Sequence, residues 1–272
     1  MPMQGSQLKV VVVNLARSAD RRQQMAAILS PLGIRFEFFQ AIDGRAGKHA
    51  LFDRVDQRLA EVRRGFTLNG GEMGCFASHY LLWERCVREN TPLLIFEDDV
   101  AIDDSFMKAY SVTGERISRL GLIRFSGHKE RAFTEYEKID DGVKIVRFLK
   151  GPNGTSSYAV SPKAAKRLLA KASTWFEPVD LHLDRFWTHG VDSLGLFPYP
   201  VSHIANTAEQ SEIWQGAQRA PKSRRFRKLR AIYRARDDVL RFLANLPYLL
   251  GTSKYLPAEV SQPIPERLEE NS

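Results

Sequence analysis

Two short runs of consecutive apolar residues limit most strongly what this chain can fold into. Residues 8–15 read LKVVVVNL and residues 92–96 read PLLIF. A strand with one solvated face alternates apolar and polar residues, whereas an unbroken apolar run indicates a strand that is covered on both faces. Such strands belong to central sheets with helices on both sides. We therefore expect a buried sheet that runs through the middle of the molecule.

The segments around these runs alternate between strand-like and helix-like patterns. Residues 34–43 alternate like a second strand, and residues 120–127 and 155–161 are further strand candidates. Residues 69–90 space their apolar side chains by three and four positions, which is typical of a helix with one buried face. Residues 44–66 are polar and irregular, which predicts a surface excursion. Together these patterns predict an α/β fold with a mostly parallel central sheet.

The positive charge of the chain is concentrated near its C-terminus. The net charge is +8, and the stretch from Lys222 to Arg241 holds nine Lys and Arg against two Asp, a local charge of +7. We expect a main domain of residues 1–220 and a basic helical tail of residues 221–272, weakly ordered from Pro257 onward. A nucleic-acid-binding protein would spread its basic residues over a face of the folded domain, so we expect no nucleic-acid partner.

The two cysteines and the apolar segments indicate the cellular compartment of the protein. If Cys75 and Cys86 lie on one helix, 11 positions separate them by roughly 16 Å, whereas a disulfide tolerates only about 7 Å between Cα atoms. We therefore expect two thiols and a reducing environment. The first apolar run stops at Asn14, too early for a signal peptide, and no stretch reaches the roughly 20 apolar residues of a membrane span. These features predict a cytoplasmic protein.

Three adjacent acids, Glu97, Asp98 and Asp99, directly follow the second apolar run. In α/β sheets, ligands bind beyond the carboxyl ends of the strands. Two converging carboxylates raise each other's pKa unless a cation neutralises them, and oxygen ligands suit Mg²⁺ or Mn²⁺, which can bridge to substrate phosphates. The alternative is that the acids face the positive end of a downstream helix dipole.

The order EDDVAID does not fit the D-x-D-x-[TV] pattern of phosphatases with an Asp nucleophile.

Four segments of the chain occur in an order that is known from one family. They read VVVNLARSADRR with FEFFQAIDG, LNGGEMGCFASHYLLW, LLIFEDDV, and GTSSYAVSPKAAKRLL with PVDLHLD. Over about residues 8–206 this series resembles glycosyltransferase family 25, which contains bacterial lipooligosaccharide galactosyltransferases and collagen galactosyltransferases. The family motifs read INL-x-R-x-x-x-RR, G-E-x-G-C-x-x-SH and I-x-EDD. The resemblance says nothing about the identity of the acceptor.

The resemblance implies a GT-A-like nucleotide-sugar-binding fold, a UDP-sugar donor (usually UDP-galactose), a divalent Mn²⁺ or Mg²⁺, and inversion at the anomeric carbon. The EDD sequence would take the place of the D-x-D metal motif. For a bacterial enzyme the expected acceptor is a lipid-linked oligosaccharide, the core of lipooligosaccharide or lipopolysaccharide. The alternatives are a metal-dependent phosphohydrolase that acts on a nucleotide sugar, and a non-catalytic homologue that binds a glycan or a membrane.

The resemblance also suggests which side chains bind the donor. Residues after the first strand would contact the nucleotide, Arg22 is expected at the diphosphate, and the SH pair would line the donor site. In the GPNGTSSYAVS segment, a glycine allows close backbone approach and hydroxyls can hold sugar oxygens. The full donor-binding set is Asn14, Leu15, Arg17, Arg22, Ser78, His79, Asp98, Gly154, Thr155 and Ser156. A zinc site at Glu72, Cys75 and His79 is not expected because too few ligands are present.

An inverting transfer needs one general base that deprotonates the acceptor hydroxyl. Asp180 in PVDLHLD is the first candidate, with Asp184 and Glu72 as alternatives. The predicted metal ligands are Glu97 and Asp99, with His203 as a third ligand. For Asp180, Asp184 and Glu72 the alternative is a surface acid or a helix cap.

The basic tail combines arginines with apolar residues at near-helical spacing, namely Phe226, Leu229, Tyr233, Leu240 and Leu243. This pattern is typical of a helix that lies on an anionic membrane surface. It would place the protein on the inner face of the bacterial cytoplasmic membrane, close to a lipid-linked acceptor. The alternative is a solvated helix packed on the domain.

Overall fold

The first apolar run forms β1 (Lys9–Asn14) inside a nine-stranded sheet. The computed structural model describes residues 8–140, 142–204, 225–251 and 260–261. Val10 and Val12 lie in the hydrophobic core on one face of the sheet, Val11 lies in the core on the other face, and all three are fully buried. The prediction of a strand covered on both faces is confirmed.

The strand order is β11-β6-β7-β9-β5-β8-β3-β1-β2. After β1, the strands are β2 (Phe36–Gln40), β3 (Leu93–Glu97), β5 (Leu122–Arg124), β6 (Phe133–Lys138), β7 (Lys144–Phe148), β8 (Ser157–Val160), β9 (Leu194–Phe197) and β11 (Val260–Ser261). Their pairings send β2, β1, β3, β5, β9 and β6 in one direction and β8, β7 and β11 in the other. The sheet is therefore mixed and mostly parallel, as predicted, and consistent with a GT-A-like fold.

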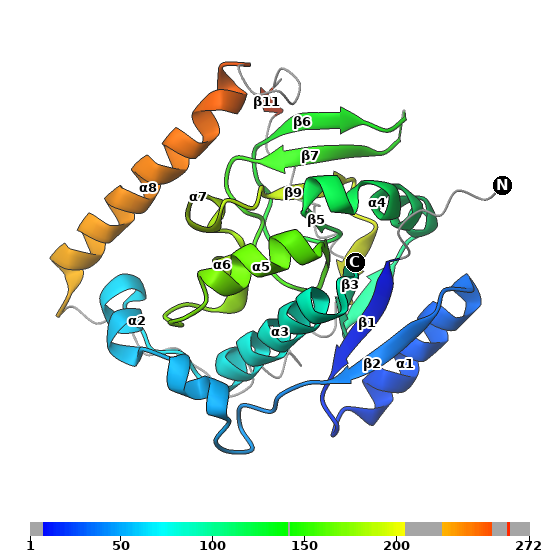
Figure 1. The fold of residues 1–272 in the computed structure, drawn as a ribbon, viewed down its shortest axis with the longest axis horizontal. Helices are drawn as coiled ribbons and strands as arrows, with labels where there is room; N and C mark the ends of the chain where they lie inside the picture. The colour runs from blue at the N-terminus through cyan, green and yellow to red at the C-terminus, as the bar shows by residue number, and fades with distance from the viewer. Residues whose placement is uncertain (1–7, 141, 205–224, 252–259, 262–272) are drawn as a thin grey trace, which may run out of the picture.

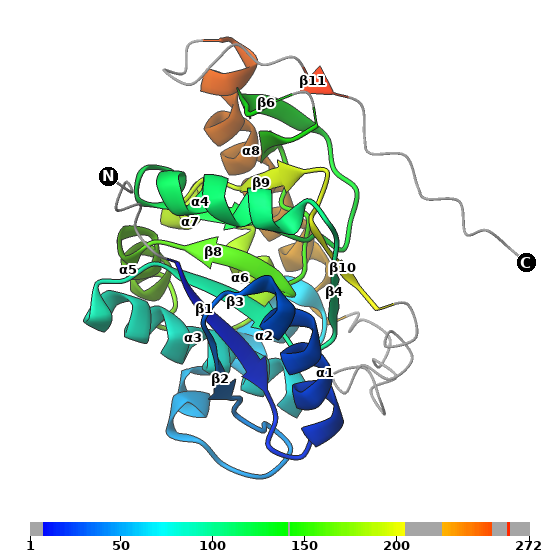
Figure 2. The same cartoon turned by 90° about the vertical axis from the view of Figure 1, so that its right-hand side faces the viewer.

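Helices cover both faces of this sheet (Figures 1 and 2). One face packs against α1 (Ala19–Leu29) and α4 (Phe106–Leu120). The opposite face packs against α3 (Gly70–Glu89), α5 (Pro162–Ala170) and α6 (Val179–Leu183). The short helices η1 (Ser30–Leu32), η2 (Ala50–Arg54) and α7 (Phe186–His189) complete this part of the chain.

The start of α3 is fixed by a reciprocal cap. The Asn69 side chain accepts a hydrogen bond from the Glu72 backbone N–H at 2.8 Å, and Glu72 Oε2 accepts one from the Asn69 N–H at 3.0 Å. These two bonds satisfy amide groups that have no partner within the helix. Cys75 and Cys86 both lie on α3 as free thiols, as predicted.

A separate two-stranded ribbon extends from the end of β3. It pairs β4 (Val100–Ile102) with β10 (Val201–His203) in antiparallel register, with His203 opposite Val100. The Ile204 N–H also donates to the Asp99 carbonyl at 3.3 Å. The ribbon therefore brings a histidine from late in the chain next to the three acids.

The prediction of an irregular surface excursion over residues 44–66 is wrong for its second half, which contains α2 (Gln57–Arg64). Asp56 caps this helix by accepting from the Leu59 N–H at 2.7 Å. Nearby, the Gln57 side chain exchanges two hydrogen bonds with the Leu68 backbone, and from far along the chain Asp237 accepts from Arg63 at 2.9 Å. The distant part of this support leaves no pattern in the local sequence.

The basic tail contains α8 (Arg227–Leu249), which packs along α2 and α7 (Figure 1). Asp237 accepts hydrogen bonds from Arg185 at 2.7 and 2.9 Å in addition to the bond from Arg63. The apolar stripe predicted for the tail is divided between two faces of the helix. Tyr233 lies under the Arg63 guanidinium at 4.6 Å, whereas Leu243 is 53% exposed.

None of the helices in the described ranges is both long and apolar enough to cross a bilayer. The prediction of weak order from Pro257 onward lies outside the described residues, except for the two residues of β11.

Candidate active site

A cavity of about 800 Å³ opens at the carboxyl ends of β1 and β3. Its wall includes the turn after β1, the first turns of α3, the three acids, the loop before β8 and the start of α6. Ligands of α/β proteins bind at this edge of the sheet, because loops of different strands meet there. The cavity therefore opens at the edge of the sheet where the sequence predicted a site.

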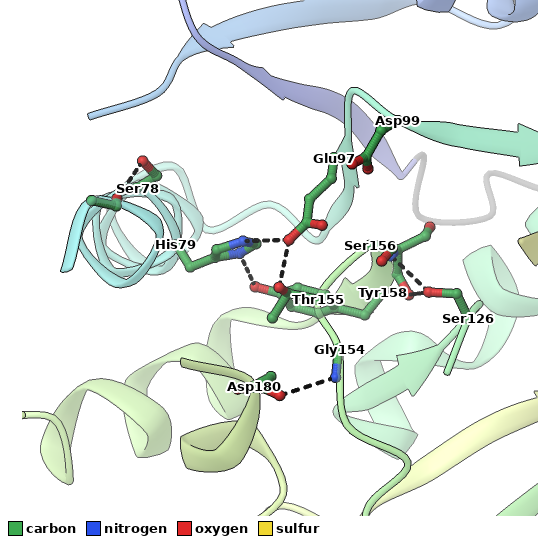
Figure 3. Close-up of polar contacts among 12 residues, drawn as sticks. Ser78, His79, Glu97, Asp99, Ser126, Gly154, Thr155, Ser156, Tyr158 and Asp180 are labelled. Atoms are coloured by element: carbon green, nitrogen blue, oxygen red, sulfur yellow. Dashed lines mark hydrogen bonds and ion pairs between the residues drawn. The ribbon is translucent and has the colours of Figure 1, made fainter. Parts of the chain in front are cut away.

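The three acids point to different neighbours. Asp98 accepts a hydrogen bond from Asn14 Nδ2 at 2.6 Å and from Arg21 Nη1 at 3.3 Å. Figure 3 shows the Glu97 carboxylate between His79 and Thr155, contacts that Asp99 does not share. Asp99 lies 3.6 Å from Arg21, and its Oδ1 atom is buried without a hydrogen-bond partner among the described residues.

The surroundings push the pKa values of Glu97 and Asp99 apart. Burial disfavours the ionised form of Glu97, but the hydrogen bond and charge of His79 and the Thr155 hydroxyl outweigh it and lower the pKa. For Asp99, burial and the charges of Glu97 and Asp98 raise the pKa to about 7. Glu97 is therefore held as a carboxylate, whereas at Asp99 the positive charge of Arg21 does not outweigh burial and the two neighbouring acids.

This imbalance fits a divalent cation. The buried, unpartnered Asp99 Oδ1 offers a lone pair to a ligand, and the adjacent acids supply more negative charge than Arg21 alone can balance. An all-oxygen donor set of this kind suits Mg²⁺ or Mn²⁺. His203 Nδ1 lies 3.9 Å from Asp99 Oδ1, so the predicted third ligand stands beside the predicted second one.

A second group of possible metal ligands lies on the α3 side. Ligand atoms of Cys75, His79 and Glu97 lie within 4.8 Å of one another. Burial, together with the charge of Glu97, raises the pKa of Cys75 well above its usual value, so the sulfur is a neutral thiol. Glu97 is already held by Thr155 and His79, so Asp99 has the more available carboxylate oxygen for a ligand.

His128 joins His203 at the cavity wall. The Nε2 atoms of the two rings face each other at hydrogen-bond distance, and Ser156 Oγ lies 2.5 Å from His203 Nε2 and 3.2 Å from His128 Nε2. Burial and the neighbouring His128 lower the pKa of His203, which keeps its ring neutral and able to act as a ligand. Ser156 thus positions two histidines and does not itself line the cavity.

The loop before β8 is shaped by glycine and by a buried arginine. Gly154 has φ +82°, and a Cβ at this position would lie 1.8 Å from His128 Cδ2. Arg124 donates to the Gly154 carbonyl and, at 2.8 Å, to Asp184. The Gly154 N–H donates to Asp180 Oδ2 at 3.3 Å. These bonds set Thr155 next to Glu97 (Figure 3).

Replacing Gly154 by alanine should destabilise the protein by more than the roughly 1–3 kcal/mol that a positive φ alone costs. The added methyl would also displace His128. Urea unfolding measures the loss. Gly33→Ala is the matched control, because Gly33 has φ +67° and open space around it. Equal losses in the two variants would contradict the close approach of His128.

The three candidates for a general base differ in the hydrogen bonds and ion pairs that their carboxylates already form. Asp180 lines the cavity, and among the described residues its side chain makes only long hydrogen bonds, to the Gly154 N–H at 3.3 Å and to Asn153 Nδ2 at 3.4 Å. Asp184 is buried against Arg124 and accepts from the Asn153 N–H at 2.8 Å. Glu72 is engaged in the α3 cap. Asp180 is therefore the acid that is best placed to accept a proton from a ligand.

The predicted donor-binding residues separate into three groups. Leu15, Arg17, Ser78, His79, Asp98, Gly154 and Thr155 line the cavity, as do Glu97, Asp99 and His203. Asn14 and Ser156 lie behind the wall, where they hold Asp98 and the histidines. Arg22 stacks on Phe38 at 4.0 Å, away from the cavity, and Arg21 takes the position that was predicted for it. The expectation for Arg22 is therefore corrected in favour of Arg21.

Three residues of the site have no counterpart in the sequence prediction: Arg21, Arg124 and His128. Arg21 stands in the same RR pair as Arg22, and only the position of the helix distinguishes the two. His128 follows β5, so its place after a predicted strand could have identified it. In the sequence Arg124 is an ordinary strand residue, and only its ion pair with Asp184 in the folded structure identifies it.

Comparison with known proteins identifies the family to which the chain belongs. The sequence model of glycosyltransferase family 25, described as LPS biosynthesis protein, matches residues 7–183. The chain is 30% identical over 171 residues to the lipooligosaccharide biosynthesis protein lic2B of Haemophilus influenzae, covering 58% of this chain and 61% of that protein. It is 29% identical over 186 residues to the lacto-N-neotetraose biosynthesis glycosyltransferase LgtB of Neisseria gonorrhoeae, covering 62% and 64%.

A third relative is the probable inactive glycosyltransferase 25 family member 3 of Rattus norvegicus, which is 30% identical over 170 residues. That match covers 60% of this chain and 30% of the rat protein. The matched region thus spans less than two thirds of each of these relatives. The family model extends over more than half of the 272 residues and includes the three acids and Asp180. This chain belongs to glycosyltransferase family 25.

Proposed function

We propose that this protein is an inverting, metal-dependent glycosyltransferase that moves a sugar, galactose, from a UDP-sugar to a saccharide acceptor. The acceptor we propose is the lipid-linked core oligosaccharide of lipooligosaccharide or lipopolysaccharide, in line with the names of the bacterial relatives. One observation carries the proposal: the buried, unpartnered Asp99 oxygen at the end of β3, inside a cavity large enough for a nucleotide sugar.

Asp99 would hold the divalent ion, with Glu97 and His203 beside it. When bound, Mn²⁺ or Mg²⁺ supplies positive charge to the diphosphate and to the leaving UDP. The chain itself contributes Arg17, Arg21 and Arg45 to the same wall, where guanidinium groups suit phosphate oxygens. Thr155 and His79 keep Glu97 ionised and fixed in place.

Asp180 would act as the general base. Its carboxylate accepts the proton of the acceptor hydroxyl while that oxygen forms a bond to the anomeric carbon and the bond to the UDP oxygen breaks. The long contacts to the Gly154 and Asn153 nitrogens hold the carboxylate without fully occupying its lone pairs. Asp184, which is tied to Arg124, is better suited to positioning this loop.

A panel of UDP-sugars with Mn²⁺ and a saccharide acceptor tests the proposed function directly. We expect UDP and a new glycoside in equal amounts, with UDP-galactose as the best donor, and no turnover after chelation. UDP release without a glycoside would indicate a phosphohydrolase instead. No turnover and no binding with any donor would indicate a non-catalytic homologue, as the name of the rat relative suggests for that protein.

The variant Asp180→Asn should lower kcat by about a hundredfold or more, because general-base catalysis contributes on that order. Asparagine keeps the shape of the side chain and its contact with the Gly154 N–H. The affinity for UDP, measured by calorimetry, should stay unchanged. A kcat close to the wild-type value would remove Asp180 from this role and leave Asp184 or Glu72 as the base.

Mn²⁺ affinity should depend on pH through Asp99. Its pKa is raised to about 7, so below pH 7 the metal must displace a proton, and affinity should fall about tenfold per pH unit. Above pH 7 affinity should level off. Without metal, the ionised carboxylate costs folding stability as the pH rises from about 4 to 7. Electron paramagnetic resonance of free Mn²⁺ at a series of pH values measures the affinity. A constant affinity from pH 5.5 to 7.5 would contradict it.

The outer face of α8 supports an anionic membrane surface as a partner. Ile232, Val239 and Phe242 are 64%, 57% and 57% exposed, and Leu229 and Leu243 continue the same apolar face. Arg227, Lys228 and Arg236 are exposed on the same helix, and basic residues of this kind suit a helix lying on acidic lipids. We propose that α8 brings the cavity to a lipid-linked acceptor.

Vesicle sedimentation tests this part of the proposal. The protein should sediment with phosphatidylglycerol vesicles and much less with phosphatidylcholine vesicles, and Ile232→Ser with Phe242→Ser should reduce the bound fraction. Equal recovery in the supernatant with both lipids would exclude the membrane role.

A further inference from the structure

A second cavity, of about 450 Å³, lies next to the first. The two share Arg64, Asn153 and Leu181 as lining residues, so they adjoin on the side of Asp180. The second cavity is formed by the end of α2, the loop before β8, the α6–α7 segment and the inner face of α8. Nothing in the proposed handling of the donor uses it.

The wall of this cavity carries a surplus of positive charge. It contains six arginines and lysines against four acids. Each acid is already close to a basic partner: Asp237 to Arg63 and Arg185, Glu177 to Arg185 and Arg64, Asp238 to Arg241, and Asp184 to Arg124 behind the wall. The acids are therefore occupied and leave some of the cations without a counter-charge.

Lys150 and Arg234 are those cations. Within the described ranges, neither makes an ion pair or a side-chain hydrogen bond with the rest of the protein. Partial burial and the positive charges of Arg131 and Arg241 lower the pKa of Lys150, which indicates a local positive potential. Such a potential is relieved by an anion, because the charges would otherwise repel one another.

The cavity also has aromatic residues in its wall. Phe66, Trp187 and Tyr233 line it, and aromatic rings pack against the apolar C–H faces of sugars. The Arg63 guanidinium covers one face of Tyr233, and Arg185 and Arg241 lie over Trp187. The Trp187 indole N–H is buried and has no hydrogen-bond acceptor in the described part of the chain. Aromatic rings and unbalanced cations in one cavity are therefore matched to a ligand that is both a saccharide and an anion.

We propose that the second cavity binds an acidic group, a phosphate or a carboxylate, carried by the acceptor saccharide. This inference rests on the proposed function, since it assigns the donor to the first cavity and the acceptor to the second. Lys150 and Arg234 contact the acidic group by charge-assisted hydrogen bonds. A sugar held there, across Leu181 from the first cavity, presents its neighbouring residue to Asp180.

The test uses glucose 6-phosphate, glucuronic acid and glucose as probes, in NMR titrations of the full chain. Excess UDP is present so that phosphate binding in the first cavity is blocked. We expect both acidic sugars to bind and glucose not to bind. The double variant Lys150→Met/Arg234→Met should weaken the acidic sugars at least about tenfold, since each charge-assisted bond is worth more than 1 kcal/mol. The two acidic probes distinguish phosphate from carboxylate as the preferred group.

The matched control is Lys163→Met/Lys166→Met, which removes the same charge from exposed positions on α5 outside both cavities. It should bind the acidic sugars like the wild type. Three results would overturn the proposal: no binding of either acidic sugar, equal binding of glucose, or equal losses in the two double variants. Because no turnover is measured, acidic sugars that bind through Lys150 and Arg234 in a protein without transferase activity would refute only the proposed function.

Discussion

Replacing Asp99 by asparagine is expected to abolish tight Mn²⁺ binding and to reduce sugar transfer by about a hundredfold to a thousandfold. Loss of one preorganised electrostatic group at a leaving oxygen has effects of that size. The substitution keeps the shape of the side chain and removes the charge that the cation would neutralise. Metal binding is measured by electron paramagnetic resonance and transfer by product formation.

The same variant should be at least as stable as the wild type at pH 8 in the absence of metal. Burial and the neighbouring acids raise the pKa of Asp99, so its ionised form is unfavourable in the folded protein and an amide removes that cost. A lower Tm would mean that lost activity reflects unfolding. Asp104→Asn, an exposed acid outside the cavity, is the control and should change neither property. Unimpaired Mn²⁺ binding in Asp99→Asn would contradict the proposal that Asp99 is a metal ligand.

The second large effect is expected for Arg124→Met, which should lower the free energy of unfolding by about 3–5 kcal/mol at pH 8. Arg124 is 1% exposed and pairs with Asp184, so its removal leaves a buried carboxylate without compensation. Because burial raises the pKa of Asp184 to about 6 even in the wild type, protonation at pH 5 relieves the isolated charge. The loss in the variant should therefore be smaller at pH 5 than at pH 8, as measured by urea unfolding.

Arg119→Met provides the comparison for this effect. Arg119 pairs with Glu137 at the surface, where its side chain is 50% exposed, and surface ion pairs contribute about 1 kcal/mol or less. If both variants lose the same stability, burial of the Arg124 pair is not what matters. The Arg124 variant should also bind donor less tightly, since the loop at Gly154 loses its hydrogen bond.

Local patterns in the sequence were enough to predict the parts of the fold that are stabilised locally. An unbroken apolar run marks β1 and β3, and the acids that follow β3 identify the edge where the cavity opens. The regular apolar spacing of α3 likewise predicts a helix, which its cap then fixes at Gly70. In each case one segment carries the whole signal.

Features that depend on distant partners could not be predicted in this way. Arg21 and Arg22 are adjacent in sequence, but one position turns a helical side chain by about 100°, so the choice between them depends on where α1 lies against Asp98. The helix α2 and the second cavity depend on contacts with α8 that span more than 170 residues. No pattern within a short window contains such information.

The position of β9 has a consequence for how the chain reaches its native state. This strand lies between β5 and β7, so the hairpin of β6 and β7 joins the sheet only through residues that follow it by about 50 positions. During synthesis the hairpin can pair with the rest of the sheet only after Leu194–Phe197 has left the ribosome. The pairing of β7 with β9 is therefore expected to form late in folding. A fragment that stops at residue 183, where the family match ends, would leave the hairpin without the strand that pairs it to the sheet, so that its contacts with α4 would have to hold it.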